Sequence, residues 1–321
     1  MTTSTTPTGE SRIQDFISQR DLVAVLAFLK SYQQLGSLAR TFMLKEHSLM
    51  LVRLRNGEDQ FASYPQKEKD FVEVLVYVEL LERLCLIIED LAKLLHALQF
   101  DLERFLRSIL TDKNPQNILK EINEPKWHTI LCYAPINTLP ISGDDKLFLS
   151  EIRRKNMERL NIVITLCLDF LKLYWPFFLK HKHGNTILYG LGSAIVNEEQ
   201  SFMLPAVFNQ KHPDKIKGVL VSASIYEKWQ LFLNGLVQMT QWIVERTIVF
   251  IERGGEHFAE YQTYFSLQQE EREQLEGIVK LCDAGIKRIN VIVNINATME
   301  PEFLQKFTDF YKKFDSSLIQ K

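Results

Sequence analysis

The stretch DKLFLSEIRRKNMERLNIVITLCLDFLKLYWPFFLKHKHGNTILY, residues 145–189, decides the fold of this chain. Its apolar or neutral residues recur at steps of three and four, the spacing that places side chains on one face of an α-helix. A second apolar row makes the C-terminal half of the stretch apolar on both sides. The first row is Phe148, Ile152, Leu160, Ile164, Cys167, Leu171, Trp175 and Phe178, and the second is Val163, Leu166, Phe170, Leu173 and Phe177. The pattern predicts a long helix, 146–180, in the middle of a helical bundle.

The sequence on either side predicts further long helices. The pattern at 66–110 is the longest, with no glycine or proline inside it. A helix of that length would measure about 65 Å, so we expect a bend or break near Gln99. Its heptad spacing would allow a dimer seam, but apolar residues also flank the seam, which favours burial within one chain. The remaining helices are expected at 11–46, where Gly36 could break the run, at 224–252 from a capping box Ser224–Glu227, at 267–289, and from Pro301.

One segment has a β pattern instead. Two short runs rich in β-forming residues, 201–208 and 215–223, flank the polar stretch Asn209–Asp214, which predicts a β-hairpin at 201–223. Pro205 cannot donate to a ladder, so the first strand is expected at an edge. The fold class is therefore mainly α, a bundle of long antiparallel helices with one β-hairpin.

Proline and glycine residues mark where the predicted helices end and where the connector between them lies. Residues 111–145 contain four prolines and Gly143, and we expect a connector with short helical turns that covers one end of the bundle with Trp127, Ile130, Leu131 and Tyr133. Pro176 should kink or stop the long helix. Residues 1–10 are Thr-rich and polar and are expected to be a disordered tail. Residues 11–321 should then form one domain, with a possible subdivision near 111–145.

The amino-acid composition is that of an ordinary globular protein. It is 46% hydrophobic and 24% charged, and its net charge of −2 provides no broad basic field for nucleic acid. Asp169 and Lys172 inside the most apolar stretch argue against a membrane span. The four cysteines form no CxxC pair and are expected to be reduced thiols. We expect a soluble, cytoplasmic protein.

The candidate site is a polar cluster where the long helix ends. Lys180, His181, Lys182, His183 and Asn185 gather there. Histidine titrates near neutral pH and lysine attracts phosphate, so the cluster suits an RNA backbone contact or general acid–base chemistry. The same residues also suit a solvated helix end, where cations offset the helix dipole and Gly184 caps the chain. Both interpretations stay open.

An aromatic-rich helix that ends in Lys-x-Lys-His-Gly and is followed by a β-hairpin resembles HEPN-like helical proteins of prokaryotes. The matching residues are Tyr174, Lys180, Lys182, His183 and Gly184. The resemblance implies a helical bundle, usually dimeric, and in active ribonucleases an Arg-x(4–6)-His motif at the scissile phosphate. No arginine has that spacing before His181 or His183, whereas Arg40 and His47 do. Arg40 and His47 are therefore a second candidate pair.

No other enzyme class has support in the sequence. A di-iron bundle needs Glu-x-x-His pairs, and the chain has none. We expect no metal and no cofactor. Two hypotheses remain: a non-enzymatic interaction or scaffold protein, with a second copy or another protein as its partner through a long helix face, and a HEPN-like RNA-binding protein or ribonuclease.

Overall fold

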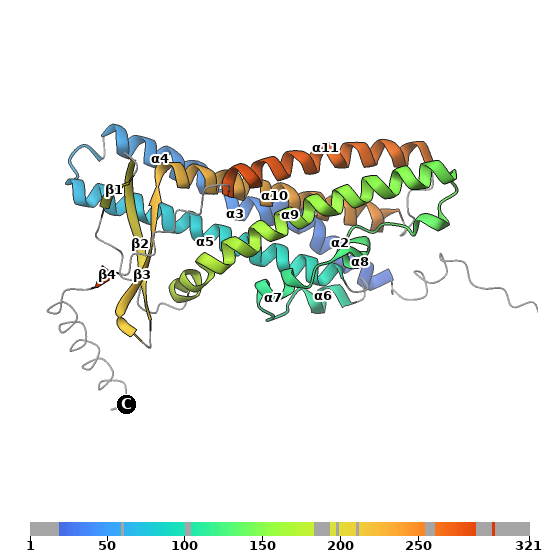
Figure 1. Ribbon diagram of the computed structural model, residues 1–321, viewed down its shortest axis with the longest axis horizontal. Helices are drawn as coiled ribbons and strands as arrows, with labels where there is room; N and C mark the ends of the chain where they lie inside the picture. Colours follow the sequence, from blue (N-terminus) through green and yellow to red (C-terminus); the bar gives the residue numbers. More distant parts are fainter. Residues whose placement is uncertain are drawn as a thin grey trace, which may run out of the picture. The chain divides into compact units, whose positions relative to one another are not determined.

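The computed structural model describes residues 19–58, 61–99, 104–182, 193–196, 199–209, 212–253, 261–286 and 297–298 (Figure 1). Several predictions lie outside these residues: the tail 1–10, the start of the helix predicted at 11–46, the end of the helix predicted at 267–289, the helix from Pro301, and His183, Gly184 and Asn185.

The chain divides into two compact units. Unit 1 comprises residues 1–50, 80–174 and 227–287, and unit 2 comprises 51–79, 175–226 and 288–321. The connector 111–145 lies wholly within unit 1.

The N-terminal helical segment continues further than its pattern predicts. It consists of α2 (Gln19–Ser31), the π-helical turn η1 (Tyr32–Gly36), α3 (Ser37–Thr41) and α4 (Leu44–Asn56). Gly36 keeps helical dihedral angles, φ −64° and ψ −50°. The amides of Phe42 and His47 donate to the carbonyls four residues earlier, at 2.7 and 2.9 Å, but α3 ends at Thr41 and a turn at residues 42–43 separates it from α4. The helix is π-helical up to Gly36 and continues as the α-helix α3 from Ser37.

Helix α5 (Gln66–Leu98) is the most deeply buried helix of the described chain. It ends at Leu98, beside the expected break, and the short α6 (Phe105–Ser108) follows separately. None of the residues from Val76 to Leu98 is exposed. The residues that flank its heptad seam, among them Leu80 and Leu84, are fully buried. The prediction that this helix is buried within one chain is confirmed.

The long helix quoted first is α9 (Gly143–Lys182), and its predicted central place is wrong in part. Both rows are largely buried: of the first row only Phe148 is exposed, at 56%, whereas Ile162, which belongs to neither row, is 47% exposed. Asp169 and Lys172 are exposed as well. α9 therefore buries one side, and α5 has the position that the sequence pattern suggested for α9.

Pro176 does not stop α9, because the helix continues to Lys182. Proline in a helix interior loses one hydrogen bond and costs about 3 kcal/mol. Trp175, Phe177 and Phe178 on either side of it are buried. Burial of three aromatic rings is large enough to offset that cost.

The connector forms short helical turns that pack on unit 1, as predicted. These are α7 (Pro115–Lys120), α8 (Glu124–Ile130) and the 3₁₀ turn η4 (Ile136–Thr138). The side chains of Asn114 and Asn123 cap α7 and α8, and a proline follows close behind each cap. The Trp127 indole donates to Oδ1 of Asn161 on α9 at 2.7 Å. The four residues expected to cover the bundle end are all buried.

The β-hairpin is present and belongs to a small antiparallel sheet in unit 2. β2 (Glu199–Asn209) and β3 (His212–Ser222) pair along their length, β1 (Ser193–Val196) adds to β2, and the two-residue β4 (Ala297–Thr298) adds to β3. β2 is therefore not an edge strand, and the prediction from Pro205 is wrong. The register shifts between Leu204 and Val207, so the proline sits at an irregularity, and β1 pairs only with residues 199–202.

Two helices complete unit 1, α10 (Ala223–Glu252) and α11 (Tyr261–Ile286). α10 begins one residue before the predicted cap at Ser224. The two helices approach closely at Gly235 and Gly285, where an added Cβ would lie 2.5 Å from the Cys282 sulfur and 2.7 Å from the Lys228 carbonyl oxygen. Helices dominate and the sheet is small, so the mainly α fold class is confirmed.

Among the described helices, α9 over Gly143–Leu179 is long and apolar enough to cross a membrane by length and composition. The core helix of a soluble protein meets the same criterion.

Candidate interaction surface

The predicted polar cluster lies at the C-terminal end of α9, and part of it lies beyond the described residues. Lys180, His181 and Lys182 occupy the last turn of α9, and only their backbone is described. His183 and Asn185 lie outside the described residues. The cluster therefore stays a prediction. Tyr174, from the same resemblance, is a buried residue of unit 1 whose ring lies 5.2 Å from that of Trp229.

Arg40 of the second candidate pair contacts an acidic residue of α5. Nε and one terminal nitrogen of Arg40 both contact Oδ2 of Asp90, each at 2.8 Å. Among the contacts of the described residues, none joins Arg40 to His47. The Nδ1 atom of His47 is buried and has no hydrogen-bond partner in this part of the chain. Arg40 acts here as an ion-pair partner of α5.

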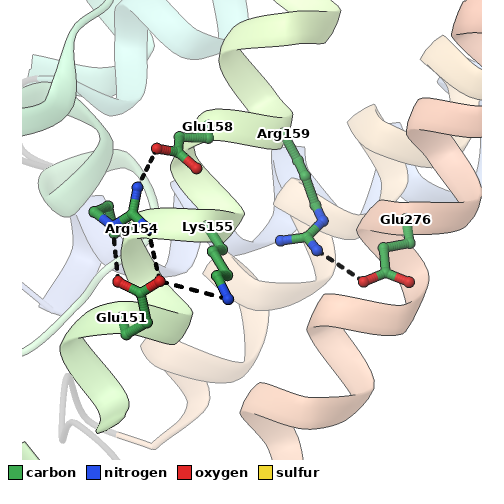
Figure 2. A network of polar contacts seen from close by, with 6 residues as sticks. All are labelled: Glu151, Arg154, Lys155, Glu158, Arg159 and Glu276. Carbon is green, nitrogen blue, oxygen red and sulfur yellow. Dashed lines mark hydrogen bonds and ion pairs between the residues drawn. The ribbon is translucent and has the colours of Figure 1, made fainter. Parts of the chain in front are cut away.

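Charged residues also line α9, and Figure 2 shows how they pair. Arg154 contacts Glu151 at 2.6 Å and also reaches Glu158, and Lys155 lies 3.5 Å from Glu151. The hydrogen bond from Arg154 is the largest cause that holds the pKa of Glu151 at about 2. These neighbours are three or four residues apart on an exposed face, so their pairing supports the helix only locally.

The same figure shows one contact between helices, from Arg159 on α9 to Glu276 on α11 at 2.7 Å. It joins two elements of unit 1 that are far apart in sequence. None of these groups forms a metal site, since the described residues contain no group of three or more metal-binding side chains.

A buried polar cluster holds the connector in place. Arg153 of α9 donates to the carbonyl of Ala134 at 2.6 Å, and Arg246 of α10 donates to that of Leu131 at 2.8 Å and pairs with Glu271 of α11. The two guanidinium carbons lie 4.5 and 5.0 Å from the centre of the Tyr133 ring.

Burial is the largest influence on the pKa values of both arginines in this cluster. Desolvation, helped by the nearby charge of Arg246, lowers the pKa of Arg153 to about 10. Desolvation also lowers the pKa of Arg246. Both guanidinium groups remain charged near neutral pH, and backbone carbonyls and aromatic faces stabilise them. We interpret the cluster as structural, because its donors are aimed at the backbone of the turn that they fix.

The feature without a structural explanation is an exposed apolar row on the N-terminal helices. We define the outer stripe as Leu38, Phe42, Lys45 and Leu49. Leu38 is 52% exposed, Phe42 67% and Leu49 42%, and Lys45 is exposed as well. Leu38 belongs to α3, Phe42 to the turn after it, and Lys45 and Leu49 to α4, and all four side chains are exposed.

The opposite face of the same helix is already buried. Leu44, Leu51 and Leu54 of α4 are all buried, and they lie on the side away from Phe42 and Leu49 at 100° per residue. A helix that faces a core on one side and solvent on the other should be polar on its outer side. This helix is apolar on both sides, so the outer stripe lacks a cover within the described chain.

A hollow of about 260 Å³ borders the outer stripe. Its walls come from α3 and α4 on one side and from α10 on the other. The lining residues are Thr41, Leu44, Lys45, Ser48, Gln230 and Asn234. Ser48 and Gln230 are hydrogen-bonded to each other across the hollow. An apolar ridge beside a polar recess is a surface that a second helix could contact.

The sequence contains a signal for this stripe, because apolar residues recur at Leu38, Phe42 and Leu49 in addition to the inner row. The inner row identifies the outer one, because a second apolar row at the same spacing must lie on the other side.

No family model, no curated protein and no solved structure matches this chain.

Proposed function

We propose that this chain is a helical interaction protein, a non-enzymatic scaffold that binds a protein partner through the outer stripe. The observation that carries the proposal is the exposure of Leu38, Phe42 and Leu49 along α3, the turn after it and α4. Leucine and phenylalanine side chains gain about 1.5–3 kcal/mol each on full burial, so a partner that covers three of them gains a substantial driving force.

The face has the anatomy of a binding surface. A large aromatic residue, Phe42, lies between two leucines, and aromatic anchors commonly dominate the binding energy of protein interfaces. Lys45 adds a charge that disfavours wrong partners or registers. The helix is braced from within unit 1, since Arg40 is paired with Asp90 and Arg83 donates to the carbonyls of Ala39 and Arg40, each at 3.2 Å. A braced helix loses little conformational freedom when a partner binds.

The heptad seam of α5 is exposed only near its start, where Phe71 is 42% and Leu75 38% exposed. From Val76 to Leu98 its residues are packed inside the chain. A partner that used this seam would have to displace the helices that already cover it. The proposed contact therefore moves from the helix that the sequence pattern favoured to the N-terminal helices.

Site-specific photo-cross-linking tests the proposal. A photoreactive phenylalanine analogue replaces Phe42 in one variant and Leu147, an exposed apolar residue of α9, in the control. After irradiation in the native host we expect a discrete adduct, identified by mass spectrometry, from position 42 and none from position 147. Leu49→Glu in the same chain should abolish the adduct. Absence of any adduct from position 42 would contradict the proposed function.

A further inference from the structure

We propose that the hollow between α3, α4 and α10 binds a small oxyanion, the carboxylate or phosphate group of a ligand with few non-hydrogen atoms. This hollow borders the outer stripe, and among its described lining residues only Lys45 belongs to the stripe as well. Anion binding in the hollow and partner binding on the stripe can therefore be tested separately.

The charge and polarity of the lining select the class of ligand. Five of the six described lining residues are polar, and Lys45 is the only charged one among them. The described lining contains no aspartate or glutamate, so it offers no carboxylate to a metal cation. A polar wall also gives an apolar molecule little gain on burial. The ammonium group of Lys45 favours an anion over a neutral polar molecule.

Donors come from both walls of the hollow. Lys45 of α4 carries three N–H groups on its ammonium, and Asn234 of α10 carries two on its amide. Hydrogen bonds from a charged donor to a carboxylate or phosphate oxygen are about twice as strong as neutral ones. A carboxylate or phosphate group has at least two acceptor oxygens, so one oxyanion can accept from both walls.

The two walls are joined by hydrogen bonds within unit 1. Nε2 of Gln230 on α10 donates to Oγ of Ser48 on α4, and the same hydroxyl donates to the carbonyl oxygen of Leu44 at 2.8 Å. Leu44 is buried and provides the apolar part of the lining. Because the walls are already joined, a ligand that enters the hollow has little ordering of the protein to bring about.

The volume of the hollow limits the size of the ligand. It measures about 260 Å³, just below the range of about 300–1,000 Å³ that is usual for pockets of drug-sized ligands. A phosphate ion or a short carboxylic acid fits this space, whereas a dinucleotide cofactor is too large for it.

Thermal unfolding of the full chain with two probe anions tests the site. Inorganic phosphate and acetate are added in graded concentrations at constant ionic strength, because an anion that binds only the folded chain raises its Tm as its concentration rises. Stabilisation by phosphate alone would assign a phosphoryl ligand, and stabilisation by acetate alone a carboxylate ligand. Stabilisation by both would assign oxyanions in general.

The comparison with variants separates a site from a general salt effect, since phosphate also stabilises proteins by exclusion from their surface. Lys45→Met keeps the alkyl chain and removes the charge, and it should raise the apparent dissociation constant about tenfold or more. Asn234→Ala should raise it less. Lys172→Met, at an exposed position of α9, is the matched control and should respond as the parent does. Without added anion, the two lysine variants should unfold at nearly the same temperature as the parent.

Three outcomes would overturn the site. The first is stabilisation that is equal in the parent and in Lys45→Met, and the second is a loss that Lys172→Met reproduces. The third is that neither anion stabilises the parent chain at any concentration. None of these outcomes changes the expected adduct from position 42, so the anion site can fail while the proposed function stands.

Discussion

Arg40 is held by an acidic residue fifty positions further along the chain, Asp90 of α5. Both side chains are half-buried. Desolvation disfavours the charged guanidinium, but the hydrogen bond and the charge of Asp90 outweigh it and raise the pKa of Arg40 above its ordinary value. Burial, together with the charge of the same carboxylate, raises the pKa of Tyr32. The pair anchors the N-terminal helices to α5 at the level of the outer stripe.

Asp90→Asn should reduce the free energy of unfolding by about 1–3 kcal/mol, because it leaves the half-buried guanidinium of Arg40 without its charged partner. Urea denaturation of the parent and the variant measures the change. Glu46→Gln on exposed α4 is the matched control and should stay within about 0.5 kcal/mol of the parent. Equal effects of the two substitutions would show that the Arg40–Asp90 pair contributes no more than a surface charge.

At the scale of elements, the close approach of α10 and α11 depends on two glycines. A Cβ at Gly285 would meet the Lys228 carbonyl oxygen at 2.7 Å and Phe232 Cβ at 2.6 Å, and a Cβ at Gly235 would meet the Cys282 sulfur at 2.5 Å. Backbone atoms cannot move aside without shifting the whole helix. A cysteine side chain has more freedom to change its rotamer.

Gly285→Ala should therefore destabilise the chain by about 1–3 kcal/mol, and Gly235→Ala by less. Gly277→Ala, on the same helix α11, is the control: its added methyl group meets nothing within 4 Å, so higher helix propensity should stabilise the chain by up to about 1 kcal/mol. Thermal unfolding of the three variants measures the order of their stabilities. A stability of Gly285→Ala equal to that of Gly277→Ala would mean that the two helices are not in close contact.

The same elements show what the sequence could predict. Periodicity placed α5, α9 and α10 because apolar residues at steps of three and four leave a helix few alternatives. It could not rank the burial of α5 and α9, since Phe148 and Ile162 fit an apolar face equally well whether or not a neighbour covers it. Pro205 was misjudged for a similar reason, because register is set by pairing with distant strands.

The candidate site was less predictable than the fold. Arg40 and His47 have the spacing of a catalytic motif, but the partner of Arg40 comes from another helix, and local spacing contains no information about it. The outer stripe is local and could have been found from its two apolar rows. What local sequence does not contain is which of these rows the rest of the chain covers.

At the scale of the whole molecule, the charge and the surface chemistry favour protein contacts over RNA contacts. The net charge of −2 gives no broad basic field, and phosphate contacts supply much of the affinity of RNA-binding proteins. The exposed row on α3 and α4 is apolar apart from Lys45. The resemblance to HEPN-like proteins nevertheless predicts a specific activity, and this activity can be measured separately from assembly.

We expect the parent chain to leave single-stranded RNA intact, because Arg40 is occupied by Asp90 and no arginine precedes His181 or His183 at the required spacing. Incubation of labelled RNA with the parent, His183→Ala and His47→Ala tests this, with Leu49→Glu as a variant that alters the outer stripe alone. Cleavage by the parent that is lost in His183→Ala would assign a ribonuclease site to the end of α9, and loss in His47→Ala would assign it to α4. Cleavage that persists in both histidine variants but is lost in Leu49→Glu would mean that the activity depends on the outer stripe.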